Sequence, residues 1–359
     1  MLQRHGTGAT QSGFMDEKES GDDWRAEVGE PEPAATTVDQ ARAREPGRGR
    51  EATTPEQIPP LGWHDILWRV FWAISTDRVL STAGSVAFFA LLAFFPGIAT
   101  VVSLYGLFLD AGNIGNHLAV LAGILPAGVL ELISGQILLI GTQSGKTLGT
   151  AFLIGLGIAL WSANSGVVAL FDALNVVYDE KEKRSLLRLY GTTFLFTLGS
   201  VGFVLVALVG VVAVPVVLTV AGLPPVTESV VSILRWPVLL GCVVVVLAVI
   251  YRFGPSRNEA RWRWVTWGSV VGALLWVAAS MLFSWYVANF DSYNKTYGSL
   301  GAAVGFMVWL WLSMVVVLVG AEINAEMEHQ TARDTTEGRP KPLGGRGAMM
   351  ADHVGEAQG

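Results

Sequence analysis

Three polar residues interrupt a long apolar stretch in the first half of the chain and share one side of the expected helix. Asn164, Asp172 and Asn175 fall within about 80° of arc at 3.6 residues per turn. Polar side chains inside a membrane span are costly and normally face a partner or a water-filled path. Asp172 is therefore a candidate cation partner or proton acceptor on a substrate path. The alternative is that all three bond neighbouring helices and cap the helix end.

The last apolar stretch ends in VGAEINAE, which places Glu322 and Glu326 four residues apart with Asn324 between them. Residues four apart lie on one face of a helix. We expect Glu322 to pair with a loop arginine, such as Arg252 or Arg188, and to fix the closed arrangement of the helices. The alternative is a solvated helix end. Glu322 and Asn324 join the three earlier residues as candidate path or interhelical positions.

A polar segment just before the last apolar stretch is a candidate ligand contact. It reads ANFDSYNKTYG and leads into a Gly-rich helix start, whose free N–H groups attract anions. We expect an anionic headgroup or carboxylate to bind there. The alternative is that these glycines are small only to let helices approach closely. The candidate contacts are Asn289, Asp291, Lys295 and Tyr297.

The residue types that carry metal-dependent catalysis are scattered along the chain. A single cysteine, Cys242, excludes intramolecular disulfides and cysteine-based metal sites. The net charge of -6 leaves no basic footprint for nucleic acid. We therefore assign no catalytic residue, no metal and no cofactor, and we exclude nucleic acid as a partner. The histidines form no HExxH pattern or cluster; they are His5, His64, His117, His329 and His353.

The elements that must position these residues are membrane-spanning helices. The chain is 52% hydrophobic, with 41 Gly and 13 Trp, and its apolar runs exceed what a globular core needs. A hydrocarbon core of about 30 Å takes roughly twenty apolar residues in a helix. The sequence predicts an all-α polytopic membrane protein, surrounded by membrane lipids, with six transmembrane helices. The spans are about 79–109, 147–170, 189–220, 230–251, 264–290 and 299–321.

Cations alternate between the gaps that separate these spans. The loop 172–188 and the loop after Tyr251 each carry four Lys or Arg, whereas one cation lies in or near each of the other gaps, namely Lys146, Arg235 and Lys295. Basic loops are retained in the cytoplasm, so we expect both termini there, in a bacterial inner membrane. The stretch 117–140 then becomes an outer-face amphipathic or re-entrant segment. The alternative is seven spans with the N-terminus outside.

Composition divides the chain into a membrane domain between two tails. Residues 1–60 and 329–359 contain too few apolar side chains to offset their ordering entropy, so we expect disordered cytoplasmic tails. The membrane domain is 61–328. At its start, apolar residues recur at helical spacing from Trp63 to Ile74, which predicts an interfacial N-terminal helix. The alternative is that this helix packs on the protein's own loops.

Three blocks together resemble the YihY/BrkB family of bacterial inner-membrane proteins. They are WSANSGVVALFDALNVVYDEKEKRSLLRLY, YRFGP, and YGSLGAAVGFMVWLWLSMVVVLVGAEINAE. The resemblance covers about Val79 to Glu326 and implies six spans. It carries an old ribonuclease BN label, apparently misapplied, and a virulence label, with the molecular activity unresolved. The family-like positions are Asn164, Asp172, Asn175, Arg184, Tyr297, Gly298, Gly320, Ala321 and Glu322.

The polar positions inside the spans favour a transporter or permeation-type protein for a small or amphipathic anionic solute, or a lipid. A second hypothesis is a non-catalytic membrane scaffold that supports envelope integrity, in which the same residues serve only packing. An enzyme such as a nuclease is the least favoured hypothesis.

Overall fold

The computed structural model describes residues 36–108, 145–208, 210, 225–289 and 300–358. The stretch 117–140, expected to be an outer-face segment, lies outside the described residues. Within the described ranges the ordered elements are all helices, with one isolated bridge between Ala260 and Thr336. In chain order they are α1 (Thr37–Arg42), η2 (Pro55–Gln57), α2 (Pro60–Thr76), α3 (Val79–Phe108), α6 (Gly145–Val177), α7 (Leu186–Leu208), α9 (Pro225–Phe253), α10 (Trp262–Asn289), α12 (Leu300–Gln330) and α13 (Met349–Asp352).

Six of the described helices are long and apolar enough to cross a membrane, which confirms the predicted fold class. Their apolar segments are 19 to 28 residues long, close to the length that a hydrocarbon core requires. Each corresponds to one predicted span. The segments are Val79–Gly97, Phe152–Val177, Leu186–Ala207, Ser229–Phe253, Trp262–Val287 and Ala303–Gln330.

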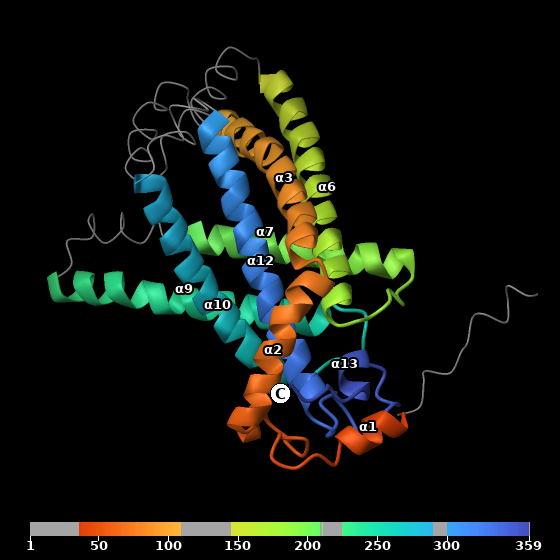
Figure 1. Cartoon of the computed structure of the whole chain (residues 1–359). Helices are drawn as coiled ribbons and strands as arrows, with labels where there is room; N and C mark the ends of the chain where they lie inside the picture. The colour runs from red at the N-terminus through yellow and green to blue at the C-terminus, as the bar shows by residue number, and fades with distance from the viewer. Residues whose placement is uncertain (1–35, 109–144, 209, 211–224, 290–299, 359) are drawn as a thin grey trace, which may run out of the picture.

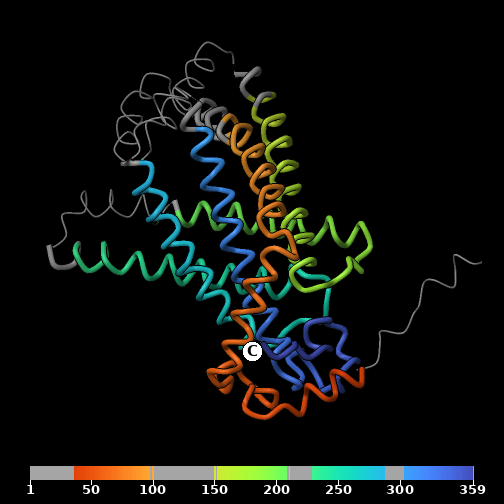
Figure 2. The backbone as a smooth tube through the Cα atoms, in the orientation of Figure 1, coloured from red at the N-terminus to blue at the C-terminus, as the bar shows by residue number. Residues whose placement is uncertain are grey.

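Helix α12 is central to the packing. It contacts α10, α3, α2, α6 and α13, while α3 packs along α6. In Figures 1 and 2, α3, α6, α10 and α12 rise from the same end of the molecule, and α7 and α9 run across them. Helix α7 packs mainly on α6, and α9 mainly on α10. Their outer faces stay uncovered, with Leu187 87% and Ile233 70% exposed, as a lipid-facing surface requires.

The buried core lies where the helix ends converge on the second half of α12. Leu174 of α6, Tyr251 of α9 and Leu318 of α12 belong to one buried cluster. A second cluster joins Ile66 of α2 to Trp264 of α10. The interior is therefore concentrated at one end of the molecule.

Residues 36–59 and 331–358 are ordered and packed, so the expectation of disordered tails is wrong for these parts. Hydrogen bonds between polar groups supply the stabilisation that the small apolar content of these segments does not. The Asp39 carboxylate accepts the N–H of Val354 at 3.0 Å. The fully buried Arg50 side chain donates to the carbonyl oxygens of Gln330 and Gly355, at 3.1 and 2.7 Å.

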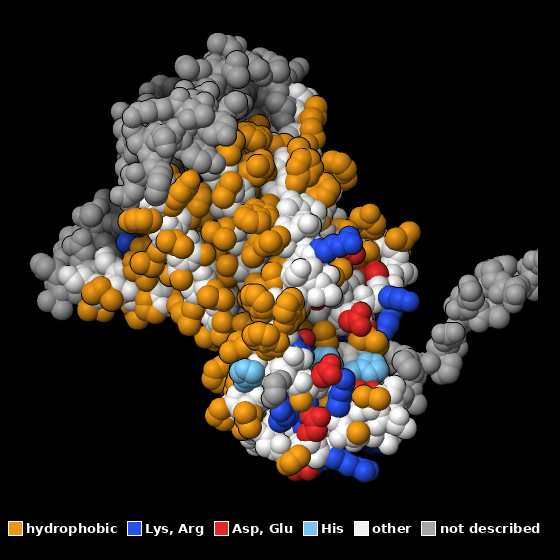
Figure 3. Space-filling model, viewed as in Figure 1, with side chains coloured by type: hydrophobic (Ala, Val, Ile, Leu, Met, Phe, Trp, Pro, Cys, Tyr) orange, Lys and Arg blue, Asp and Glu red, His pale blue; other side chains and the backbone are white. Residues whose placement is uncertain are grey.

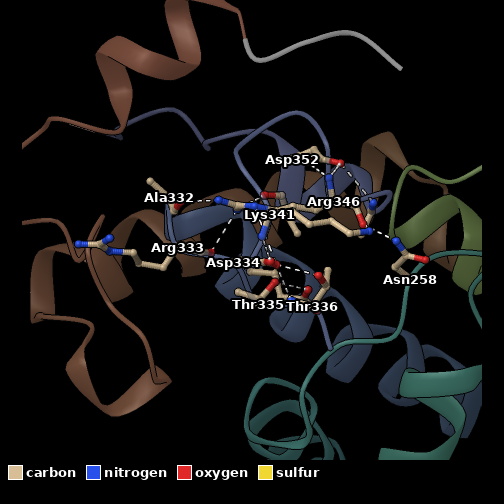
Figure 4. Close-up of polar contacts among 12 residues, drawn as sticks. Asn258, Ala332, Arg333, Asp334, Thr335, Thr336, Lys341, Arg346 and Asp352 are labelled. Carbon is tan, nitrogen blue, oxygen red and sulfur yellow. Dashed lines mark hydrogen bonds and ion pairs between the residues drawn. The ribbon is translucent and has the colours of Figure 1, made fainter. Parts of the chain in front are cut away.

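The C-terminal segment is folded around one arginine (Figure 4). Arg346 donates from its guanidinium to the carbonyl oxygens of Arg333 and Ala332, at 3.1 and 2.6 Å. Its backbone N–H donates to the Asp352 carboxylate at 2.8 Å. Buried polar groups that make several hydrogen bonds hold a loop in place even where the buried apolar area is small.

The two tails and the two basic loops meet at this end, which we call the polar end (residues 36–59, 178–185, 254–261 and 331–358). The Ala332 N–H donates to the Arg50 oxygen at 2.8 Å, and the Lys183 N–H donates to Ser256 Oγ at 2.9 Å. Because a segment before the first span touches one after the last, both lie on the same side of the membrane. The described residues thus agree with an even number of crossings, whereas the stretch 117–140, on which the seven-span alternative depends, lies outside them.

The molecular surface changes from apolar to charged where the helices meet the polar end. In Figure 3, apolar side chains cover the helices, whereas charged side chains gather at the polar end. Helix α2 lies at the boundary and exposes Leu67, Trp68, Phe71 and Trp72. Its opposite face carries Ile66 and belongs to the core. The helix thus combines the two alternatives expected of it: it packs on the protein and presents an aromatic face suited to the interface.

Candidate functional site

The last turns of α12 form a polar run that is buried on all sides. Glu322, Asn324, Glu328 and Gln330 are 0% exposed. An ionised group so placed is stable only with a partner or a bound ligand. Residues whose polar atoms have partners within the fold are therefore explained structurally, and residues without such partners are the functional candidates.

Two of the carboxylates are paired with arginines. Glu326 binds the Nε of Arg69 on α2. Glu328 receives two hydrogen bonds from Arg257 in the α9–α10 loop, at 2.8 and 2.9 Å, and both side chains are fully buried. These pairs tie α12 to α2 and to the loop.

Glu322 differs from both. Neither oxygen of its carboxylate has a hydrogen-bond partner among the described residues. The expected pairing with Arg252 or Arg188 is wrong, because Arg252 binds Glu259 and the Ala260 carbonyl instead. The alternative of a solvated helix end is also wrong, since α12 continues to Gln330 beneath the C-terminal segment.

Two more groups approach Glu322. The Asp77 carboxyl, at the end of α2, is electrostatically coupled to it. Burial raises the pKa of the Asp77 carboxyl, its interaction with Glu322 lowers it in part, and the nearby charges of Asp179 and Glu326 raise it further. The Tyr178 hydroxyl, which also senses the Glu322 charge, is buried and has no hydrogen-bond partner in the described chain. Glu322 thus lies beside an acid that retains its proton more readily and a hydroxyl able to donate.

Asn324 has a structural role. Its side-chain oxygen accepts the Gly268 N–H at 2.8 Å, and its nitrogen donates to the Val265 oxygen at 3.1 Å. A Cβ on Gly268 would collide with the Gly320 carbonyl oxygen and with Asn324. Small residues therefore let α10 and α12 approach closely here.

The polar face of α6 divides in the same way. Asn164 accepts a hydrogen bond from Thr197 of α7 at 3.3 Å. Asn175 is buried, accepts the Ser256 N–H at 2.7 Å and donates to Glu182 at 3.1 Å. Both asparagines therefore bond neighbouring segments, as the structural alternative expects.

Asp172 is the exception on this face. It is exposed, and its carboxylate makes no hydrogen bond or ion pair within the described chain. It lines an open pocket of about 420 Å³ between α3, α6 and α7. The apolar wall is formed by Phe89, Val168, Ala169, Phe171 and Leu189; the polar part is formed by Ser165, Asp172, Asn175, Glu182 and Tyr190.

The structure describes one of the four outer-loop candidates. Asn289 is the last residue of α10, at the end of that helix remote from the polar end (Figure 1). Asp291, Lys295 and Tyr297 lie outside the described residues. Their proposed contact with an anion stays a prediction.

Sequence reasoning missed four buried or partly buried polar residues at or beside the polar end, namely Asp77, Tyr178, Arg257 and Glu328. One signal was available: polar residues recur at every second position from Glu322 to Gln330. This spacing places them all around a helix. It therefore indicates enclosure by protein, since neither a lipid-facing nor a half-solvated helix tolerates it.

Together the fold and the site define a polytopic all-α membrane protein with a buried polar centre and an open pocket beside it. Its sequence matches the family described as Virulence factor BrkB over residues 70–343. The chain belongs to this family, which confirms the resemblance drawn from the three sequence blocks.

The curated relatives carry little functional information. A ribonuclease-like protein of Bacillus subtilis, YfkH, is 31% identical over 68% of this chain and 88% of its own length. A UPF0761 membrane protein of Aromatoleum aromaticum is 28% identical over 72% of this chain and 64% of its own length. One from Alkalilimnicola ehrlichii is 26% identical over 87% and 70%. No solved structure matches the chain.

Proposed function

We propose that this chain is a transporter or permeation-type protein for a small or amphipathic solute, with a membrane lipid as the first class to test. The observation that carries the proposal is Glu322, a fully buried carboxyl group inside a spanning helix that has no cationic partner among the described residues. Ionisable groups in spans normally mark a solute or proton path. Asn324, Glu326 and Glu328 are explained by their bonds, whereas Glu322 is not.

The polar end is proposed to face the cytoplasm of a bacterial inner membrane. The two loops with four cations each and both described tails meet there, and basic loops are retained on the cytoplasmic side. The preference for an anionic solute rests on Lys295 and the helix start that follows it. It remains a prediction.

We propose a non-enzymatic role. The relatives described above are mostly named only as membrane proteins, and the ribonuclease-like name belongs to the Bacillus protein. The competing proposal is a scaffold, in which the buried ion pairs serve stability alone.

Lipid movement in proteoliposomes separates the two proposals. The full chain is reconstituted with NBD-labelled phosphatidylglycerol, and dithionite bleaching reports transfer between leaflets. We expect transfer by the native chain and at least a tenfold slower rate for Glu322→Gln, which removes the charge and keeps the shape (about 1.4 kcal/mol). The exposed Glu51→Gln is the matched control. Equal rates with and without protein would favour the scaffold, as would an unchanged rate in Glu322→Gln.

A further inference from the structure

The pocket beside Asp172 contains a charge that the fold does not use. Glu182 also lines it, but its carboxylate receives two hydrogen bonds from the Arg184 guanidinium, both at 2.7 Å, and one from Asn175. Burial raises the pKa of the Glu182 carboxyl, but these bonds dominate and lower it to about 2. Asp172 is left as the carboxylate in the pocket without a cation.

The cation that holds Glu182 is already bonded. Arg184 holds Glu182, donates to the Gly254 oxygen at 2.8 Å and lies over the Phe171 ring, 5.0 Å from its centroid. It cannot neutralise Asp172 without leaving these partners. Among the lining residues, Asp172 therefore keeps a negative charge without a counter-charge, which favours a positively charged ligand group.

The rest of the pocket fits an alkyl chain. Phe89, Val168 and Leu189 form an apolar wall. Phe194 is exposed one turn after the lining residue Tyr190 on α7. Asp172 lies five residues before the end of the α6 span, about 8 Å along the helix axis. That is the depth at which a headgroup meets its acyl chains.

We infer that this pocket binds the ammonium headgroup of an amphiphile, with the Asp172 carboxylate as its charge partner and the half-exposed Tyr190 ring beside it. An amine-headed lipid and a free alkylamine share this chemistry. The inference rests on the proposed function in one respect: the pocket would bind the solute before it enters the transport path. A zwitterionic lipid also carries the anionic group predicted for the outer loop.

Native mass spectrometry of the full chain tests the inference without requiring transport. The detergent-solubilised protein receives equal amounts of phosphatidylethanolamine and phosphatidylglycerol. We expect ethanolamine-lipid adducts to predominate, and Asp172→Asn to weaken them about tenfold, equivalent to about 1.4 kcal/mol. Asp172→Lys should reverse the preference. Asp179→Asn is the matched control, because Asp179 is exposed, lies outside the pocket lining and has φ 51°, which asparagine tolerates.

The same assay distinguishes the source of the ammonium group. Octylammonium, but not octyl sulfate, should displace the ethanolamine lipid if the lipid is the occupant. Octylammonium adducts that depend on Asp172, without lipid adducts, would identify a free amine. Two results would overturn the inference. One is that both lipids form equal adducts and octylammonium binding does not depend on Asp172. The other is that folded Asp172→Asn binds both the ethanolamine lipid and octylammonium as well as the native chain does. Binding that persists while no variant moves lipid would instead refute the proposed transport and leave the pocket intact.

Discussion

The Arg257 guanidinium and the Glu328 carboxylate form a two-point ion pair whose side chains are both 0% exposed. The Tyr178 ring lies beneath the guanidinium, 4.1 Å from its carbon. Burial lowers the pKa of Arg257, but the charge of Glu328 dominates and raises it above its ordinary value. The pair thus locks a loop that follows α9 to the end of α12, at the level where the unpaired Glu322 lies.

Removing one partner of this pair should destabilise the fold strongly. Arg257→Leu leaves the Glu328 carboxylate buried without a cation, which costs about 3–5 kcal/mol. The double change Arg257→Leu/Glu328→Leu removes both charges and should recover most of that loss. Thermal unfolding in detergent, followed by tryptophan fluorescence, measures both. A single variant as stable as the native chain would contradict the burial of the pair.

Close packing of α10 on α12 should tolerate no added methyl group at Gly268. Its Cβ would meet the Gly320 oxygen and Asn324, so Gly268→Ala forces the helices apart, at about 1–3 kcal/mol. Gly305→Ala, on α12, is the control, because no atom lies within 4 Å of its Cβ position. That control should be neutral or stabilise the helix by up to about 1 kcal/mol. The melting temperatures of the two variants should therefore move in opposite directions or differ clearly.

The two asparagines of α6 should differ in their contribution to stability. Asn175→Ala leaves the buried Ser256 N–H without an acceptor, at about 1–3 kcal/mol. Asn164→Ala should cost less, because the Thr197 hydroxyl also has the Thr193 oxygen as an acceptor at 2.9 Å. Reversible unfolding in SDS mixtures gives both free energies. Equal losses would show that the Ser256 contact is not formed.

Acid should loosen the contact between the two tails. Burial raises the pKa of the Asp39 carboxyl, but hydrogen bonds from Val354, Thr36 and His353 dominate and lower it from 3.8 to about 2. A lowered folded-state pKa means that the stabilisation is complete above about pH 4 and is lost as the pH falls towards 2. Hydrogen exchange of residues 353–356, corrected for intrinsic rates, should accelerate over that window. Asp39→Asn should show fast exchange already at pH 6, with little further change on acidification.

Much of the architecture could be predicted from the sequence. Long apolar runs have few stable arrangements in a bilayer, and the positions of Lys and Arg record which loops stayed on one side. The six spans follow from these two facts. The same reasoning identified Glu322 and Asp172 as residues that packing does not easily explain.

Only the tertiary structure decided which polar residues have partners. Asn175 and Asp172 lie three residues apart on one helix, yet one meets a loop backbone and the other faces an open pocket. Glu322 and Glu328 belong to the same run, and only Glu328 meets an arginine. Such pairings join residues far apart in the chain, 71 positions for Arg257 and Glu328 and 81 for Ser256 and Asn175. Local periodicity carries no information about them.

The order in the two tails also could not be predicted from the sequence. Their composition predicts disorder because that prediction considers only how much apolar surface a segment can bury. Residues 36–59 and 331–358 are held instead by buried guanidinium groups, Arg50 and Arg346, that bond carbonyl oxygens at distant points of the chain. A charged side chain that needs several acceptors stabilises a loop only after the fold has brought those acceptors together. The amino-acid order therefore decided the helices, and the assembled bundle decided the polar end.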